Sequence, residues 1–337
     1  MPTLRDYDYI RASSTTEALD ALSQYGPDAM FLAGGTDLLV QVRHDAISPS
    51  CLIDLESISS LGGIAEENGF LSIGAMVTLR QVEKSTAVCS GFPALAQSAS
   101  DVGAVQLRNR ATIGGNLCQS PKCPYYNQSH INPFMRESIK PCIRRGGKTC
   151  HTTRWGREIS HALITGKSRC QASFGSNVAT ALAALGGFAM LVSKSGSREV
   201  NIEKLYDEDG HPTFASDEIL SLIKIPLGTP STNVFIQYKP NPASYTLLNI
   251  GVLLDLKDDG KTCKNARVWL GGVAPRPYEA KAVEEFLRGK KLNSEVIENA
   301  SRLLFERVDV SEATVAFKVA KARAMCREAL IKASETG

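Results

Sequence analysis

The chain of 337 residues lacks a hydrophobic run long enough to cross a membrane. Its most apolar stretch, residues 177–192, is shorter than the roughly 18 residues that a spanning helix needs, and Gly186 and Gly187 interrupt it. The first residues also lack the apolar core of a secretory signal. We therefore expect a cytoplasmic protein that makes no contact with a membrane.

The sequence also lacks the features of a disulfide-stabilised protein. Nine cysteines are an odd number, and no secretory signal accompanies them, which favours reduced thiols. Four are scattered singly in apolar or helical surroundings and are expected to be ordinary thiols: Cys51, Cys89, Cys263 and Cys326. Four others lie within 48 residues, and grouped thiolates are typical ligands of a soft metal or an iron–sulfur cluster: Cys123, Cys142, Cys150 and Cys170.

The net charge of +3 hides an uneven distribution. Between Arg136 and Arg169 there are nine Lys or Arg and two Asp or Glu, a local balance of +7. The segment can be a solvated basic loop, a counter-charge for an anionic cluster, or a docking surface for an acidic partner. Nucleic-acid binding is not expected, because aromatic residues for base stacking are not interleaved with these charges.

The length predicts two or three domains, and 43% hydrophobic with 22% charged residues is typical of a globular protein. Helix and strand patterns form a small unit over residues 1–55 and a second unit over residues 56–228. Within the second unit we expect an extended segment at 107–113 and a closing strand at 218–226, with Pro226 marking the sheet edge. From about residue 229 strands precede helices, which predicts a separate α+β domain.

Two glycine turns stand out. The first, within Phe31–Leu38 (FLAGGTDL), follows a predicted strand and precedes a predicted helix. The second is Thr112–Asn116 (TIGGN). Glycine lets the backbone approach a phosphate closely, and helix starts attract negative charge. Each turn alone is a weak signal, because neither is a G-x-G-x-x-G fingerprint or a P-loop. Two such turns at one cleft can hold both phosphates of a dinucleotide.

AGGTDL followed by ATIGGNL resembles the FAD-binding subunit of the molybdenum hydroxylase (xanthine dehydrogenase) family, over nearly the whole chain. The segment 271–277 and the pair Phe317–Lys318, in place of the family's Tyr-Arg, are similar to its last domain. The resemblance implies an α+β protein. Residues 1–55 and 56–228 would form a two-lobed FAD-binding domain of the vanillyl-alcohol-oxidase/PCMH type. Residues 229–337 would form a domain like the CO dehydrogenase flavoprotein C-terminal domain.

The same resemblance assigns the FAD contacts. The first turn supplies Phe31, Leu32, Ala33, Gly34, Gly35, Thr36, Asp37 and Leu38, and the second supplies Thr112, Ile113, Gly114, Gly115 and Asn116. Spacing places Val102, Leu220 and Lys239 near the flavin. Asn177 stands where the family has an aspartate, and Pro240 to Pro242 stand where it often has arginine.

Residues 118–172, here named the cysteine segment, are similar to the beta subunit of 4-hydroxybenzoyl-CoA reductase, which inserts a [4Fe–4S]-binding loop. The resemblance makes Cys123, Cys142, Cys150 and Cys170 the cluster ligands and Cys118 a non-ligand. Structural zinc remains an alternative, although zinc sites usually use close cysteine pairs. Three histidines of the segment can replace a ligand or serve as hydrogen-bonding residues: His130, His151 and His161. The spacing of 20 between the last two cysteines exceeds the family's loop, so residues 155–167 look like an extra excursion.

The resemblance implies an oxidoreductase subunit that carries FAD and a [4Fe–4S] cluster and performs no bond chemistry itself. Its partners would be a molybdopterin-binding large subunit, a [2Fe–2S] small subunit and a ferredoxin-type electron carrier. One alternative is the flavin subunit of another molybdenum hydroxylase, acting on a purine, an aldehyde or an N-heterocycle. Another is a zinc-binding interaction protein without flavin.

Overall fold

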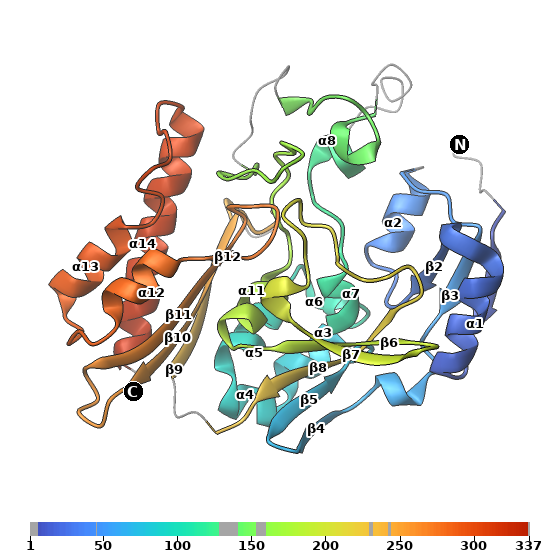
Figure 1. The fold of residues 1–337 in the computed structure, drawn as a ribbon, viewed down its shortest axis with the longest axis horizontal. Helices are drawn as coiled ribbons and strands as arrows, with labels where there is room; N and C mark the ends of the chain where they lie inside the picture. The colour runs from blue at the N-terminus through green and yellow to red at the C-terminus, as the bar shows by residue number, and fades with distance from the viewer. Residues whose placement is uncertain are drawn as a thin grey trace.

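The computed structural model describes residues 6–44, 46–127, 141–152, 160–228, 232–241 and 244–335. His130 and residues 155–159 of the expected excursion at 155–167 lie outside these ranges. Helices and strands form three sheets and the helices packed on them, so the expected α+β class is confirmed (Figure 1).

The N-terminal lobe is built on a parallel sheet in which β3 (Cys51–Asp54) lies between β1 (Asp8–Arg11) and β2 (Ala29–Leu32). Helix α1 (Thr15–Tyr25) starts at Ser14, whose side chain accepts a hydrogen bond from the amide of Glu17, as a cap should. A 3₁₀ turn, η1 (Gly26–Asp28), joins α1 to β2. Helix α2 (Leu38–Arg43) follows the first glycine turn, as predicted.

The second lobe is an antiparallel sheet in the order β4-β5-β8-β6-β7. Its strands are β4 (Ile64–Glu67), β5 (Phe70–Gly74), β6 (Phe188–Ser193), β7 (Gly196–Asn201) and β8 (Ile219–Pro226). The expectation that residues 218–226 form an edge strand is wrong, because β8 lies in the centre of this sheet. Pro226 is tolerated because it is the last residue of β8, where it pairs with Phe70.

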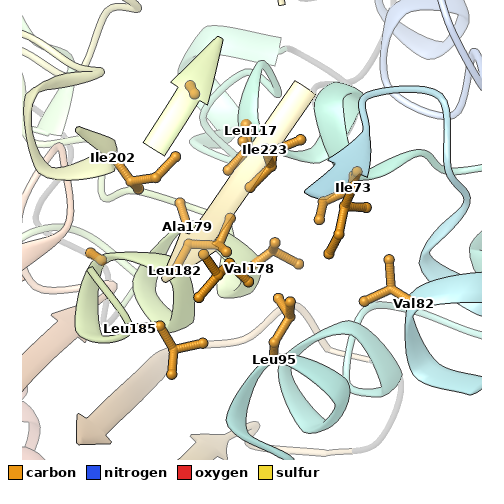
Figure 2. Packing of buried hydrophobic residues seen from close by; sticks show 14 of the residues in the cluster. Ile73, Val82, Leu95, Leu117, Val178, Ala179, Leu182, Leu185, Ile202 and Ile223 are labelled. Carbon is orange, nitrogen blue, oxygen red and sulfur yellow. The ribbon is translucent and has the colours of Figure 1, made fainter. Parts of the chain in front are cut away.

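Helices cover this sheet and surround the buried α11 (Asn177–Ala184), every residue of which is buried. Figure 2 shows Val178, Ala179 and Leu182 of α11 among side chains from several other elements, Leu95, Leu117 and Ile223 included. The other helices are α3 (Leu79–Lys84), α4 (Thr86–Gly91), α5 (Pro93–Ser100), α6 (Val105–Arg108) and α7 (Ile113–Leu117), with 3₁₀ turns η2 (Ser59–Leu61) and η4 (Ile202–Lys204).

The expected extended segment at 107–113 is wrong, because it contains the end of α6 and the start of α7. Thr112 caps α7 by accepting a hydrogen bond from the amide of Gly115 at 3.0 Å. Gly114 and Gly115 lie inside this helix, where glycine is normally unfavourable. The helix therefore depends on its cap and on burial, which local propensity does not reveal.

The C-terminal domain has an antiparallel sheet in the order β12-β11-β10-β9. Its strands are β9 (Thr232–Tyr238), β10 (Leu248–Leu256), β11 (Cys263–Gly271) and β12 (Tyr278–Glu279). Helices α12 (Lys281–Leu287), α13 (Ser294–Arg302) and α14 (Ala313–Glu335) lie on one side, with α12 and α14 packed on the sheet (Figure 1). Helices α5 and α11 of the second lobe pack against its strands as well, which joins the C-terminal domain firmly to that lobe.

Candidate functional site

The two glycine turns lie side by side. A Cβ atom added at Gly34 would overlap the carbonyl oxygen of Arg110, just before the second turn. A Cβ at Gly115 would lie 3.8 Å from the Cβ of Ala33 in the first turn. Gly35 has a φ of 73°, a left-handed conformation that favours glycine. The close approach of the turns therefore explains glycine at position 34, and the backbone conformation explains it at position 35.

A cavity of about 940 Å³, here named the main cavity, opens where the two turns meet. This volume lies near the upper end of the range for small-molecule sites, roughly 300 to 1,000 Å³. The cysteine segment and the C-terminal domain also reach it, the latter through Lys239 and Tyr245. Three parts of the chain that are distant in sequence thus enclose one space.

Most of the expected cofactor residues line the main cavity: Phe31, Ala33, Gly34, Gly35, Thr36, Asp37, Leu38, Val102, Thr112, Gly115, Asn116, Asn177 and Lys239. Four others are not among its lining residues. Ile113 and Leu220 are buried in the hydrophobic core, Gly114 packs against Ala75, and Leu32 pairs with Asp54 in the first sheet.

Asn177 is the centre of a hydrogen-bond network between the second lobe and the C-terminal domain. Its Oδ1 accepts from Asn249 Nδ2 at 2.8 Å, and its Nδ2 donates to Gln237 Oε1 at 3.2 Å and Thr246 Oγ1 at 3.3 Å. An aspartate could not donate these last two bonds. The network therefore gives a physical reason for asparagine at this position.

Lys239 and Asp101 form a second polar pair at the cavity wall. Lys239 Nζ donates to the carbonyl oxygen of Asp101 at 2.8 Å. Burial lowers the pKa of Lys239 and raises the pKa of Asp101. Gln237 hydrogen-bonds to Asp101, which connects this pair to the Asn177 network. A continuous chain of polar contacts thus connects two lining residues, Lys239 and Asn177, through Asp101 and Gln237.

The cysteine segment enters the main cavity directly after α7. Cys118 faces it, exposed to the cavity space yet surrounded by protein, and this burial raises the pKa of its thiol to about 12. Lys122 forms an ion pair with Asp37 of the first glycine turn. The amide of Ser120 donates to the other oxygen of Asp37 at 3.0 Å. Neither Ser120 nor Lys122 carried a recognisable signal in the sequence.

Three of the four grouped cysteines lie near one another. Burial raises the pKa of Cys123 to about 12, and the neighbouring Cys170 and Cys142 add to this rise. Burial also raises the pKa of Cys142, with a further contribution from Cys170. Cys123 follows directly on Lys122 at the start of α8 (Pro124–Asn127) and lines the main cavity.

Cys150 is placed by a tight turn. The amide of Ile143, in the 3₁₀ turn η3 (Ile143–Arg145), donates to the carbonyl oxygen of Thr149 at 3.0 Å. This bond holds the residue that precedes Cys150 next to the residue that follows Cys142. The Cys150 sulfur lies 3.1 Å from Thr152 Oγ1.

The described parts of the segment are fixed to the loop at Asp209 and Gly210 and to the C-terminal domain. Arg144 donates to the carbonyl oxygens of Asp209 at 2.6 Å and Gly210 at 3.0 Å. The amide and hydroxyl of Ser168 both donate to Asp209 Oδ1, at 2.9 and 2.6 Å. Lys318 Nζ of α14 donates to the carbonyl oxygen of His161 at 2.6 Å. Figure 1 shows the segment with α8 above both lobes and the C-terminal sheet in that view.

The ends of the segment meet at Tyr206. Its hydroxyl donates to the carbonyl oxygen of Leu117 at 2.8 Å, and its ring lies edge-on to Phe174 with 4.7 Å between the ring centroids. Because Leu117 precedes the segment and Phe174 follows it, the insertion leaves the core and returns to it at nearly one point.

Within the ranges given above, no three His, Cys, Asp or Glu side chains converge closely enough to hold a single metal ion. A structural zinc needs four ligand atoms around one ion, so a preformed zinc site is not found in that part of the chain. Among the described helices, none has the length and apolar character required to span a membrane.

Comparison with known proteins identifies the family. Residues 5–228 match the family described as the FAD binding domain in molybdopterin dehydrogenase. Residues 235–333 match the CO dehydrogenase flavoprotein C-terminal domain. The chain is an FAD-binding subunit of the molybdenum hydroxylase family. The expected family, flavin cofactor and oxidoreductase class are thereby confirmed, and the flavin-free zinc protein loses its basis.

Several named relatives support this family assignment. It is 28% identical to the aldehyde oxidoreductase FAD-binding subunit PaoB of Escherichia coli K12, over 83% of this chain and 86% of the relative. It is 25% identical to the caffeine dehydrogenase subunit beta of Pseudomonas sp. CBB1, over 91% of this chain and 86% of that relative. Quinoline 2-oxidoreductase of Pseudomonas putida 86 has the same fold, with a TM-score of 0.76 at 24% identity over 99% of both chains.

The residues of the main cavity fit FAD. The glycine turns leave the backbone at the cavity edge free of side chains, as a pyrophosphate needs. Lys122, Lys239 and Asn177 are polar residues of the same lining, beside which the remaining polar groups of FAD would lie. FAD, when bound, stores two electrons and can exchange them singly. The FAD-binding subunit itself contributes position, burial and hydrogen bonding.

Proposed function

We propose that this FAD-binding subunit also carries a [4Fe–4S] cluster in its cysteine segment, and that the subunit relays electrons as part of a larger molybdenum enzyme. The grouping of Cys123, Cys142 and Cys170 is the observation that carries this proposal. A cubane cluster takes one thiolate at each of four irons, so its ligands stand further apart than those of one metal ion. Cys150, placed by the turn at 143–149, is the fourth ligand.

The position of the segment supports a role in electron transfer. Cys123 lines the main cavity together with both glycine turns, so the cluster would border on the flavin. Burial raises the pKa of Cys123 and of Cys142, so these two thiols ionise only beside a compensating cation, and a cluster would supply iron. The basic character of the segment supports either compensation for an anionic cluster or docking of an acidic carrier. We infer a ferredoxin-type carrier on this side.

The partners follow from the family. We propose two partner subunits, a molybdopterin-binding large subunit and a [2Fe–2S] small subunit. Electrons would pass between these partners and the external carrier through the FAD-binding subunit. The similarity of the cysteine segment to the beta subunit of 4-hydroxybenzoyl-CoA reductase favours a reductive enzyme of that type. The flavin contacts of Asn177 and Lys239 are part of this proposal.

A second candidate is the flavin subunit of a different molybdenum hydroxylase. It is favoured by the relatives named for aldehyde, caffeine and nicotinate oxidation, which match over 83 to 91% of the chain. In that case the external acceptor need not be a ferredoxin. Reduction of bound FAD by NADH and by a reduced ferredoxin, compared by stopped-flow absorbance, separates the two candidates.

The deciding test is anaerobic analysis of iron, sulfide, zinc and FAD in the purified chain, with EPR spectra after dithionite reduction. We expect about four iron, four sulfide and one FAD per chain. Cys170→Ser should lose iron, whereas Cys89→Ser, an exposed thiol outside the segment, should keep it. FAD without iron would contradict the cluster and leave a flavin subunit.

A further inference from the structure

His161 holds a place beside the cysteines that the family match does not assign. Its side chain is buried, with 1% of the residue exposed, and its Nε2 lies 3.7 Å from the Cys123 sulfur. Both residues line the main cavity. A ring nitrogen at this distance is within hydrogen-bonding range of a thiolate sulfur.

The ring is fixed from the side. Tyr125, two residues after Cys123, stacks on His161 with 6.2 Å between the ring centroids and 4° between the planes. Tyr125 also meets the ring of His151 at 5.8 Å. The aromatic contact ties the histidine to the same helix, α8, that follows Cys123.

The backbone of His161 is fixed from three directions. The amide of Ala162 donates to Gln171 at 2.8 Å, and the hydroxyl of Ser173 donates to the carbonyl oxygen of Ser160 at 2.7 Å. Lys318 donates to the carbonyl oxygen of His161 itself at 2.6 Å. The last contact crosses 157 positions of the chain and comes from the C-terminal domain.

Lys318 is an unusual anchor. Only 1% of the residue is exposed, and a buried ammonium costs free energy unless it is hydrogen-bonded. A packing role alone would be served better by an apolar side chain. Its ammonium donates to the carbonyl oxygen of His161, the residue beside Cys123, and this bond offsets part of that cost.

We propose that His161 sets the reduction potential of the cluster, and that Lys318 is the positioning residue that keeps His161 against Cys123. The inference rests on the proposed cluster. An N–H donated to a thiolate ligand stabilises the more negative, reduced state of a metal centre and so raises its potential. The C-terminal domain thereby acts on a centre held by the second lobe.

The experiment is an EPR-monitored redox titration of the iron-loaded chain and its variants. His161→Phe keeps an aromatic ring for Tyr125 but removes the N–H, and we expect a lower midpoint potential at unchanged iron and FAD content. His161→Gln keeps a donor and should stay near the wild-type potential. An iron-loaded His161→Phe chain with the wild-type potential would overturn the proposal.

The positioning role has its own variants. Lys318→Met should lower the potential in the same direction, and its crystal structure should show the His161 ring moved away from Cys123. Lys318→Arg keeps the charge and the donors and should retain most of the effect. Lys332→Met, on the same helix in a surface pair with Glu328, should change neither property. An unmoved ring in Lys318→Met would contradict the positioning role even if the potential changed.

The two proposals fail in distinguishable ways. A chain without iron contradicts the proposed cluster, and metal analysis detects this before any titration. A chain with iron whose potential is insensitive to His161 contradicts only the further inference.

Discussion

Asp37 of the first glycine turn forms an ion pair with Lys122 of the cysteine segment, 85 positions further along the chain. The carboxylate also accepts hydrogen bonds from the amide of Ser120 and from Gln41, both at 3.0 Å. One side chain therefore belongs both to the turn assigned to FAD and to the attachment of the segment that carries the cysteines. A substitution of Asp37 or of Lys122 should therefore affect both the first glycine turn and the attachment of the cysteine segment.

Lys122→Met tests this connection. The side chains of Lys122 and Asp37 are about three-quarters buried, at 23% and 26% exposure, so their pairing is worth more than that of a surface pair. We expect the dissociation constant for FAD to rise about tenfold, equivalent to about 1.4 kcal/mol, as measured by flavin fluorescence titration. Lys167→Met removes an exposed pair with Glu208 and should leave FAD binding unchanged. Equal affinities in the two variants would contradict the connection.

Gly34→Ala should abolish FAD binding and lower the melting temperature. The added methyl group would overlap the carbonyl oxygen of Arg110, so the two turns would have to separate. Gly91→Ala is the matched control, because a Cβ there meets nothing within 4 Å. Flavin content after purification and thermal unfolding measure the effect. Wild-type flavin content in Gly34→Ala would show that the turns need not touch.

Asn177→Asp should destabilise the contact between the second lobe and the C-terminal domain. It removes the donor to Gln237 and Thr246 and sets a carboxylate oxygen against Gln237 Oε1. A lost hydrogen bond with an unsatisfied buried partner costs about 1 to 3 kcal/mol, measurable by urea unfolding. Asn68→Asp makes the same change in an exposed turn and should be neutral. The prediction fails if both variants unfold at the same urea concentration.

The rate at which alkylating agents modify Cys118 should depend on pH more steeply than the rate of an exposed thiol. With a pKa of about 12 instead of 9, its thiolate fraction keeps rising through the alkaline range. Between pH 8 and pH 10 we expect the alkylation rate to rise about a hundredfold, against about tenfold for an ordinary thiol. Mass spectrometry of the labelled peptide follows the rate, and bound FAD should slow it. A rate that levels off near pH 9 would contradict the burial of this thiol.

Much of the site was predictable from local sequence. The first glycine turn lies between a strand and a helix, as its residues indicate, and the pairing of the two turns follows from their shared chemistry. The expected assignment of residues 107–113 failed because a capped helix of five residues with two glycines resembles a loop in any local pattern. Strand β9 has apolar residues on both of its faces, Val234 and Ile236 on one and Phe235 on the other, so its sequence lacks the alternation that marks a half-buried strand.

Other contacts depend on distant parts of the chain and left no local signal. Lys318 was noted only as a replacement for an arginine, whereas its partner is the backbone of His161. The central place of β8 depends on pairing with β5 and β6, which are separated by more than 100 residues in sequence. The role of Asn177 required knowledge of Gln237 and Asn249 across the domain contact.

The meeting of Leu117 and Phe174 at Tyr206 has a consequence for how such a chain can change over generations. An insertion whose two ends nearly touch can be gained or lost without moving the walls around it. A flavin protein with a short loop between these ends and one with the full cysteine segment can share the same core. The proposed cluster would therefore be a module that a lineage can acquire at one joint, while the surrounding fold stays as it was.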